Sequence, residues 1–156
     1  MKFGRFANDT YTIRNWFDKM IKMMKQIIIN LGVKDLQKSA GFYKVIGFEP
    51  QYADETTTRL VWSEHISLMI TEMSKFASFA TKPLVDTSSA MAGYFSLTVE
   101  SIEQMNDLMT KRLEAGGTES SEKSDYGFMQ QRTLEDLDGH TWNLMYIDLA
   151  KMLTAR

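Results

Sequence analysis

Residues 27–36 read IIINLGVKDL, and residues 93–102 read GYFSLTVESI. Each stretch is an apolar run that ends at a valine and then becomes polar, as a strand followed by a helix would. The two valines, Val33 and Val99, lie 66 residues apart, which is longer than the periods of common solenoid and propeller repeats. The chain therefore contains two copies of one large module.

Both copies continue in the same way. Asp35 can cap a helix that ends at Gly47, and the second copy has a helical pattern over residues 102–114. The hairpin from Asp136 to Gly139 joins the last two strands, with Gly139 able to take a positive φ. The other expected strands cover residues 48–52, 57–62, 65–71, 118–121, 127–134 and 141–147. The predicted fold is α+β, with the order β-α-β-β-β twice.

The length of 156 residues and a hydrophobic content of 44% are enough for one compact domain with a core of its own. We expect this domain at residues 26–149. Its predicted parts are module 1 (26–72), a linker (73–92) with one helical turn and module 2 (93–149), followed by a tail (150–156).

Residues 1–25 form a basic amphipathic extension, with six Lys and Arg against two Asp. Its apolar residues recur at helical spacing. Three interpretations stay open: a helix docked on the body or on a partner subunit, a leader that the natural product does not use, and a helix that binds a membrane surface.

Composition excludes several classes of protein. The chain has no cysteine, so disulfides, thiolate metal sites and thiol nucleophiles are impossible. Residues 26–156 are acidic, which argues against binding nucleic acid. No apolar run approaches the roughly 20 residues of a membrane span, and the amino terminus lacks a secretion signal. We expect a cytoplasmic protein that binds neither nucleic acid nor a membrane.

Two stretches resemble the vicinal oxygen chelate superfamily, which includes glyoxalases, bleomycin-resistance proteins and extradiol dioxygenases. They are VKDLQKSAGFYKVIGF at residues 33–48 and DLDGHTWNL at residues 136–144. The resemblance implies two paired modules whose curved sheets enclose a cavity. It also implies a homodimer.

In that family a divalent metal is held at four cavity positions and acts as a Lewis acid. The matching positions here are Ile28, Tyr94, Asn143, and either Ser67 or Met69. None is a histidine or a carboxylate, which zinc and hard cations require in number. The match therefore implies a member without the metal, and we expect no cofactor.

Only two histidines are present, His65 and His140, and each starts a strand after a turn. Strand alternation points His140 away from Asn143, and so away from the cavity if Asn143 faces inward. We expect both to be turn or surface residues. A relocated iron site of two histidines and one carboxylate would need both of them inside the cavity.

Alternation also divides the first strand of each module into a helix-covered face and a cavity face. The cavity face combines apolar side chains with hydroxyl and amide groups, as small-molecule pockets do. The alternative is a filled interior whose polar groups satisfy one another. The predicted ligand-binding residues are Ile28, Asn30, Gly32, Met69, Tyr94, Ser96, Thr98, Phe128, Asn143 and Met145. Three further aromatic residues are placed at the mouth: Phe76, Phe79 and Tyr126.

Two functions follow from this site. The first is a metal-independent protein that binds a small, partly apolar organic molecule, as the bleomycin-resistance branch does. The second is a lyase or isomerase of the lactoylglutathione-lyase type. Without a metal, this enzyme would stabilise an enediolate through Asn30, Tyr94 and Asn143 and would have no evident general base. A metal enzyme with relocated ligands and a dimer without a ligand also stay open.

Overall fold

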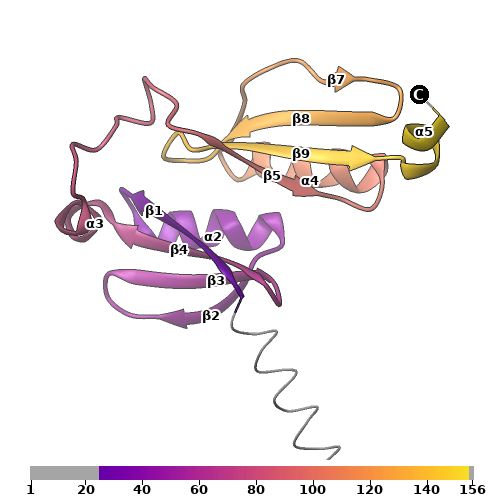
Figure 1. Cartoon of the computed structure of the whole chain (residues 1–156). Helices are drawn as coiled ribbons and strands as arrows, with labels where there is room; N and C mark the ends of the chain where they lie inside the picture. The colour runs from indigo at the N-terminus through magenta and orange to yellow at the C-terminus, as the bar shows by residue number, and fades with distance from the viewer. Residues whose placement is uncertain (1–24, 155–156) are drawn as a thin grey trace, which may run out of the picture.

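The computed structural model describes residues 25–154, and Figure 1 shows two modules that follow one another along the chain. The basic extension predicted for residues 1–25 lies outside the described residues, apart from Lys25. Within the described part, no helix has the length and apolar character needed to cross a membrane.

Module 1 forms a four-stranded sheet covered by one helix. Asp35 caps the helix by accepting a hydrogen bond from the Lys38 backbone, and Gly47 ends it with φ 106°. The sheet order is β1-β4-β3-β2, with β1 and β4 parallel and the other pairs antiparallel. The elements are β1 (Ile27–Val33), α2 (Leu36–Ile46), β2 (Glu49–Ala53), β3 (Thr57–Ser63) and β4 (Ile66–Glu72).

Module 2 repeats this topology, which confirms the duplicated α+β fold. Its sheet order is β5-β9-β8-β6, with β5 and β9 parallel, and a short strand β7 pairs with β8. The predicted bounds of the helix and of the last strand match the structure. The elements are β5 (Tyr94–Thr98), α4 (Ile102–Glu114), β6 (Thr118–Glu119), β7 (Ser124–Asp125), β8 (Met129–Glu135) and β9 (Thr141–Ile147).

Within residues 25–154, two more helices lie outside the repeated units. The linker begins with α3 (Met73–Phe79), which is longer than the single turn expected there and contacts both β1 and β4. The tail forms α5 (Leu149–Thr154), where the sequence had predicted no helix. Five of its six residues are non-β-branched, so the segment tolerates a short helix.

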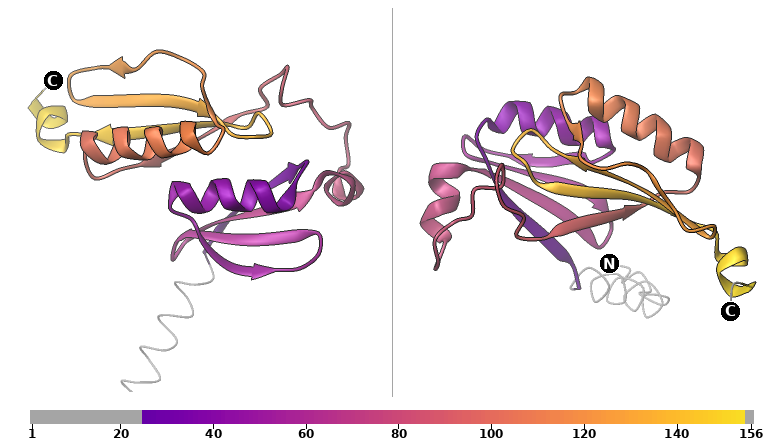
Figure 2. Two further views of the ribbon diagram at one scale, coloured as in Figure 1. Left: turned by 180° about the vertical axis from the view of Figure 1, so that it is seen from behind. Right: turned by 90° about the horizontal axis from the view of Figure 1, so that it is seen from above.

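The first strand of each module lies at the edge of its sheet that is turned toward the other module. Figure 1 shows β5 at the edge of one sheet facing β1 at the edge of the other. Figure 2 shows α2 and α4 on the same side of the molecule, where they contact each other. Each sheet therefore has one face covered by α2 or α4 and one face turned away from these two helices.

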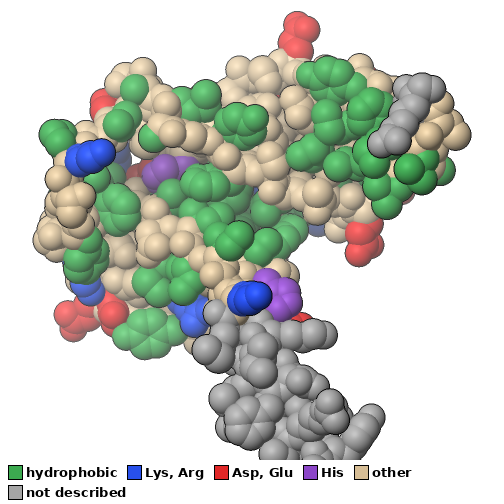
Figure 3. Space-filling model, viewed as in Figure 1, with side chains coloured by type: hydrophobic (Ala, Val, Ile, Leu, Met, Phe, Trp, Pro, Cys, Tyr) green, Lys and Arg blue, Asp and Glu red, His purple; other side chains and the backbone are tan. Residues whose placement is uncertain are grey.

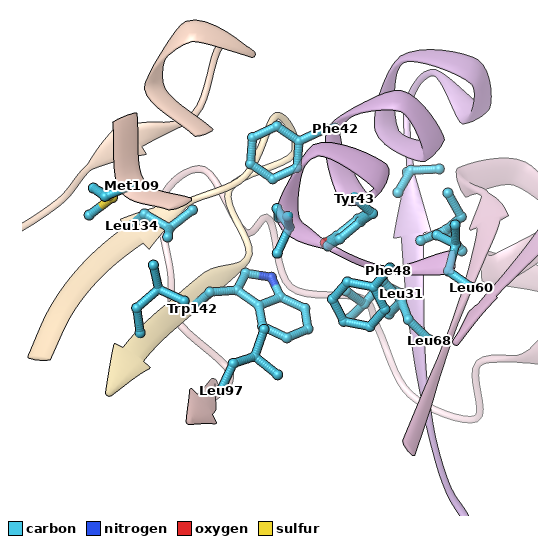
Figure 4. Close-up of a cluster of buried hydrophobic side chains, with 14 of the residues drawn as sticks. Leu31, Phe42, Tyr43, Phe48, Leu60, Leu68, Leu97, Met109, Leu134 and Trp142 are labelled. Atoms are coloured by element: carbon cyan, nitrogen blue, oxygen red, sulfur yellow. The ribbon is translucent and has the colours of Figure 1, made fainter. Parts of the chain in front are cut away.

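Trp142 on β9 joins the two halves of the core. Its side chain is fully buried, and its ring centroid lies 5.7 Å from that of Tyr43, 6.0 Å from that of Phe48 and 4.9 Å from that of Phe95. Figure 4 shows this indole between the two sheets. Aromatic pairs at such spacing are favourable beyond the apolar area they bury, so the modules share one core.

Two buried aspartates of the β8–β9 hairpin bind module 1. Asp138 accepts hydrogen bonds from the Lys34 backbone and the Ser39 hydroxyl, both at 2.8 Å. Asp136 accepts one from the Tyr43 hydroxyl. The modules therefore pair within one chain, a point that the sequence left open.

The linker is fixed to the same hairpin. The Thr87 hydroxyl donates to the Asp138 carbonyl at 2.6 Å. Gly139 beneath it has φ +88°, and a Cβ atom there would lie 2.6 Å from the Thr87 carbonyl oxygen. Both observations require glycine at position 139.

Arg112 on α4 is a buried cation with no hydrogen-bonding partner. Its side chain is fully buried, and none of its three guanidinium nitrogens bonds to a described residue. Burial lowers the pKa of Arg112 to about 9, because desolvation disfavours the charged form. No described feature explains why an arginine stands here.

Replacing Asp136 by Asn is expected to lower the free energy of unfolding by about 2–3 kcal/mol, because buried donors lose a charged acceptor. Burial raises the pKa of Asp136, but hydrogen bonds from His140 and Tyr43 outweigh it, so the net pKa is lowered. The ionised group therefore stabilises the fold near neutral pH, and this stability is lost as pH falls through the acidic range.

Urea unfolding at neutral pH and at about pH 3 measures both effects. The variant should lose part of the acid dependence of the natural chain. Asp107→Asn is the control, since Asp107 is an exposed partner of Lys111. Equal loss of stability in the two variants would contradict the role of Asp136.

Arg112→Met is expected to raise the free energy of unfolding by about 1–3 kcal/mol, since it removes an unpaired buried charge and keeps an apolar stem. Arg132→Met is the matched control, because Arg132 forms two hydrogen bonds with the Glu119 carboxylate. Thermal and urea unfolding compare the two. A destabilised Arg112→Met variant would show that the guanidinium has a favourable partner.

Candidate functional site

The cavity faces of the first strands are those that alternation predicts. On β1, Leu31 and Val33 are buried in the core, while Ile28 and Asn30 are exposed on the other face. On β5, Leu97 is buried, and its neighbours in sequence are exposed. Alternation therefore places the predicted residues of these strands on the faces turned away from the helices.

The structure also settles the position that the sequence left between Ser67 and Met69. Asn143 pairs in register with Ser96 on β5, and the equivalent residue on β1, Asn30, pairs with Met69. Met69 is therefore the counterpart of Asn143. Ser67 pairs instead with Ile28.

The four positions that the resemblance matches to the family's metal ligands are thus Ile28, Met69, Tyr94 and Asn143. Together they offer one amide, one phenol, one thioether and one alkyl group, which do not fit a zinc, magnesium or manganese site. Within residues 25–154, no three His, Asp or Glu side chains are grouped to hold a metal.

The two histidines of one chain lie too far apart to share a relocated metal site. The Ile27 backbone at the start of β1 donates to the His65 carbonyl, and the Lys34 backbone just after β1 donates to Asp138 in the hairpin that carries His140. A strand of seven residues separates these points, which is about 20 Å. One metal ion cannot bind both side chains.

A pocket of ≈ 560 Å³ lies between the modules, under the linker. It is bounded by the carboxyl end of β1, by α3, by residues 80–93 and by the starts of β5 and β9. Figure 3 shows a hollow in this surface framed by apolar side chains, with a histidine at its wall. The lining includes Asn30, Gly32, Met73, Phe76, Pro83, Leu84, Val85, Met91, Phe95, His140 and Thr141.

A second pocket, of ≈ 480 Å³, lies on the cavity face of module 1. Asn30 and Phe76 line both pockets. The lining of the second pocket is Asn30, Tyr52, Asp54, Thr57, Met69, Thr71, Lys75, Phe76 and Phe79. Phe76 and Phe79, predicted at the mouth, therefore lie at these pockets.

The two charged side chains of the second pocket, Asp54 and Lys75, form hydrogen bonds with neutral partners. Hydrogen bonds from the Thr56 backbone and the Tyr52 hydroxyl lower the pKa of Asp54 to about 2. The Lys75 ammonium donates to the Thr56 hydroxyl at 2.7 Å, and it has no carboxylate within 4.0 Å among the described residues. This pocket therefore presents both signs of charge.

Gly32 allows the Phe76 ring to lie against β1. A Cβ atom at position 32 would lie 2.7 Å from Phe76 Cδ1 and 3.0 Å from Met73 Sδ. Any larger residue must therefore move the ring that stands between the pockets.

Three of the predicted ligand-binding residues line these pockets: Asn30, Gly32 and Met69. The structure does not bring the others to either pocket. Asn143 is buried and accepts a hydrogen bond from the Thr133 hydroxyl at 2.7 Å. Ile28, Tyr94, Ser96 and Thr98 are exposed on the edge strands, and Phe128 and Met145 are half-buried in module 2.

Sequence reasoning missed His140. The imidazole is buried, and it lines the pocket between the modules, where a surface or turn side chain was expected. Its Nδ1 lies 2.9 Å from Asp136 Oδ2. The sequence did offer one signal for this pair. Asp136 and His140 are four residues apart across a tight hairpin, and this spacing brings the carboxylate and the imidazole together. His65 is exposed in its turn, as predicted.

Comparisons with known proteins identify solved structures that are similar to this chain. No protein-family model matches the sequence, and no curated protein matches it significantly. Among solved structures, the chain is similar to the hypothetical protein SA1046 from S. aureus. The two share 27% identity with a TM-score of 0.69, over 78% of this chain and 93% of that one.

Two further structures carry family names. A glyoxalase-related enzyme from Fulvimarina pelagi shares 19% identity with a TM-score of 0.67, over 78% of this chain and 88% of that one. A glyoxalase/bleomycin resistance protein/dioxygenase family enzyme from Burkholderia phytofirmans PsJN shares 14% identity with a TM-score of 0.63, over 77% and 96%. The chain therefore has the glyoxalase fold, which is the fold that the resemblance carried by residues 33–48 and 136–144 implied.

Proposed function

We propose that this chain binds a small, partly apolar organic molecule in the pocket between its modules, without a metal. The observation that carries the proposal is the pocket itself. Its volume of ≈ 560 Å³ is in the range of small-molecule sites. Its walls are mainly apolar, and a few polar side chains, such as Asn30 and Thr141, stand among them.

The residues at the four positions matched to the family's metal ligands support binding without a metal. Ile28 and Met69 offer no hard ligand, and the Asn143 amide oxygen already accepts a hydrogen bond from Thr133. Binding energy must then come from apolar contact, with polar groups fixing the orientation of the ligand. Phe76 on α3 and Phe95 on β5 both line this pocket and supply aromatic surface.

A homodimer in the cytoplasm belongs to the same proposal. Ile28 and Tyr94 are 43% and 59% exposed on the cavity faces, although both are large apolar side chains. A second copy of the chain that covers these faces would remove apolar area from water. Analytical ultracentrifugation of the natural chain and of Tyr94→Glu tests this, and a natural chain that sediments as a monomer would contradict it.

Gly32→Val is expected to weaken binding of a neutral aromatic probe, 1-methoxynaphthalene, at least tenfold, about 1.4 kcal/mol. The new side chain must displace Phe76 from the wall that both pockets share. Gly41→Ala is the matched control, because a Cβ atom there meets nothing within 4 Å.

Fluorescence titration measures the affinity of each variant, and circular dichroism checks that each is folded. The control should bind within about twofold of the natural chain, which is a few tenths of a kcal/mol. A natural chain that does not bind the probe, or a folded Gly32→Val variant that binds it equally well, would contradict the proposed pocket.

A further inference from the structure

A buried imidazole at the wall of the pocket between the modules is paired with a buried carboxylate. Asp136 Oδ2 lies 2.9 Å from His140 Nδ1, and Asp136 Oδ1 lies 3.2 Å from the same nitrogen. Both residues are buried, with 7% and 9% of their surface exposed. His140 lines the pocket, and Asp136 stands behind it in the hairpin.

The surroundings of Asp136 determine how this pair shares its proton. The carboxylate also accepts hydrogen bonds from the Tyr43 hydroxyl and from the backbone N–H groups of Asp138 and His140. These three donors, directed at one carboxylate, favour its ionised form. An ionised carboxylate can only accept hydrogen bonds, so His140 Nδ1 must carry the proton.

The other ring nitrogen is then left with a lone pair when the imidazole is neutral. No described residue forms a hydrogen bond with His140 Nε2. The neighbours of His140 in the lining include Phe95, Gly139 and Thr141. His140 Nε2 is not among the buried side-chain atoms that lack a partner, so it is open to the pocket. A ligand that displaces water from this mainly apolar wall must bring a donor of its own, since an acceptor left without a hydrogen bond is costly.

We infer that His140 Nε2 is the polar contact of this pocket, that it accepts a hydrogen bond from an O–H or N–H group of the ligand, and that Asp136 is the residue that positions it. This inference rests on the proposed function and names the ligand class. The ligand has an apolar, ring-sized body and one weakly acidic donor, as a phenol or an N–H heterocycle has. An anionic group with no proton to donate does not match this acceptor.

The tautomer can be measured without any ligand. The chain has two histidines, so a long-range ¹H–¹⁵N spectrum of the natural protein at neutral pH contains two imidazole patterns. His140→Phe identifies which pattern is that of His140. We expect His140 to carry its proton on Nδ1, and Asp136→Asn to weaken that preference while His65 is unchanged. A His140 protonated on Nε2 alone in the natural chain would overturn the inference.

A matched pair of probes tests the acceptor. 1-Naphthol carries one O–H group, and 1-methoxynaphthalene has the same ring system without it. We expect 1-naphthol to bind the natural chain at least tenfold more tightly than the ether and to shift the Nε2 resonance of His140. In His140→Phe, which keeps an aromatic ring and loses the acceptor, the ratio of the two affinities should fall to about one.

The outcomes separate the two proposals. If both probes bind the natural chain equally and the Nε2 resonance does not move, the role of His140 is overturned and the apolar pocket stands. If neither probe binds, both proposals fail. The measurements on the natural chain decide the question even if a variant does not fold.

Discussion

Two carboxylates in one hairpin, Asp136 and Asp138, are the interaction on which the rest of the structure depends. Neither module closes its core alone, because Trp142 of the second module fills the aromatic cluster that Tyr43 and Phe48 form in the first. The hydrogen bonds from Tyr43, Ser39 and the Lys34 backbone fix the position of that hairpin. Burying two carboxylates is costly unless each one is fully hydrogen-bonded. Here three of the bonds, from Lys34, Ser39 and Tyr43, come from the opposite module. Without these hydrogen bonds the two buried carboxylates would oppose folding. With them, the carboxylates determine how the two modules pair.

The same contact between the modules also forms the pocket between them. The hairpin holds the linker through Thr87 and presents His140 to the pocket, while the carboxyl end of β1 supplies Gly32 and Asn30. Because Gly32 has no side chain, α3 can place Phe76 directly on the strand. A single arrangement of hairpin, strand and helix thus defines the space in which we propose that a ligand binds.

Local sequence signals predicted most of the fold. The caps at Asp35 and Gly47, the strand alternation on β1 and the bounds of α4 and β9 all follow from short-range patterns, and the structure contains them. The site was predicted less well, since a pocket depends on which segments meet in space. Asn30, Gly32 and Met69 were found because alternation places them on a cavity face. Alternation predicts only which face of a strand a side chain occupies, so it did not place His140 at the pocket. That position depends on the β8–β9 hairpin, which turns back toward module 1, and on the linker that covers the pocket.

Calorimetric titration of the metal-stripped protein with Zn²⁺, Ni²⁺, Mn²⁺ and Fe²⁺ tests the central claim most directly, which is that the site uses organic contacts and no metal. The account predicts no stoichiometric binding of any of these ions, because Ile28, Met69, Tyr94 and Asn143 occupy the four ligand positions and His65 and His140 stand at opposite ends of β1. Tight binding of one ion per chain that an Asn143→Ala or His140→Phe substitution abolishes would contradict it.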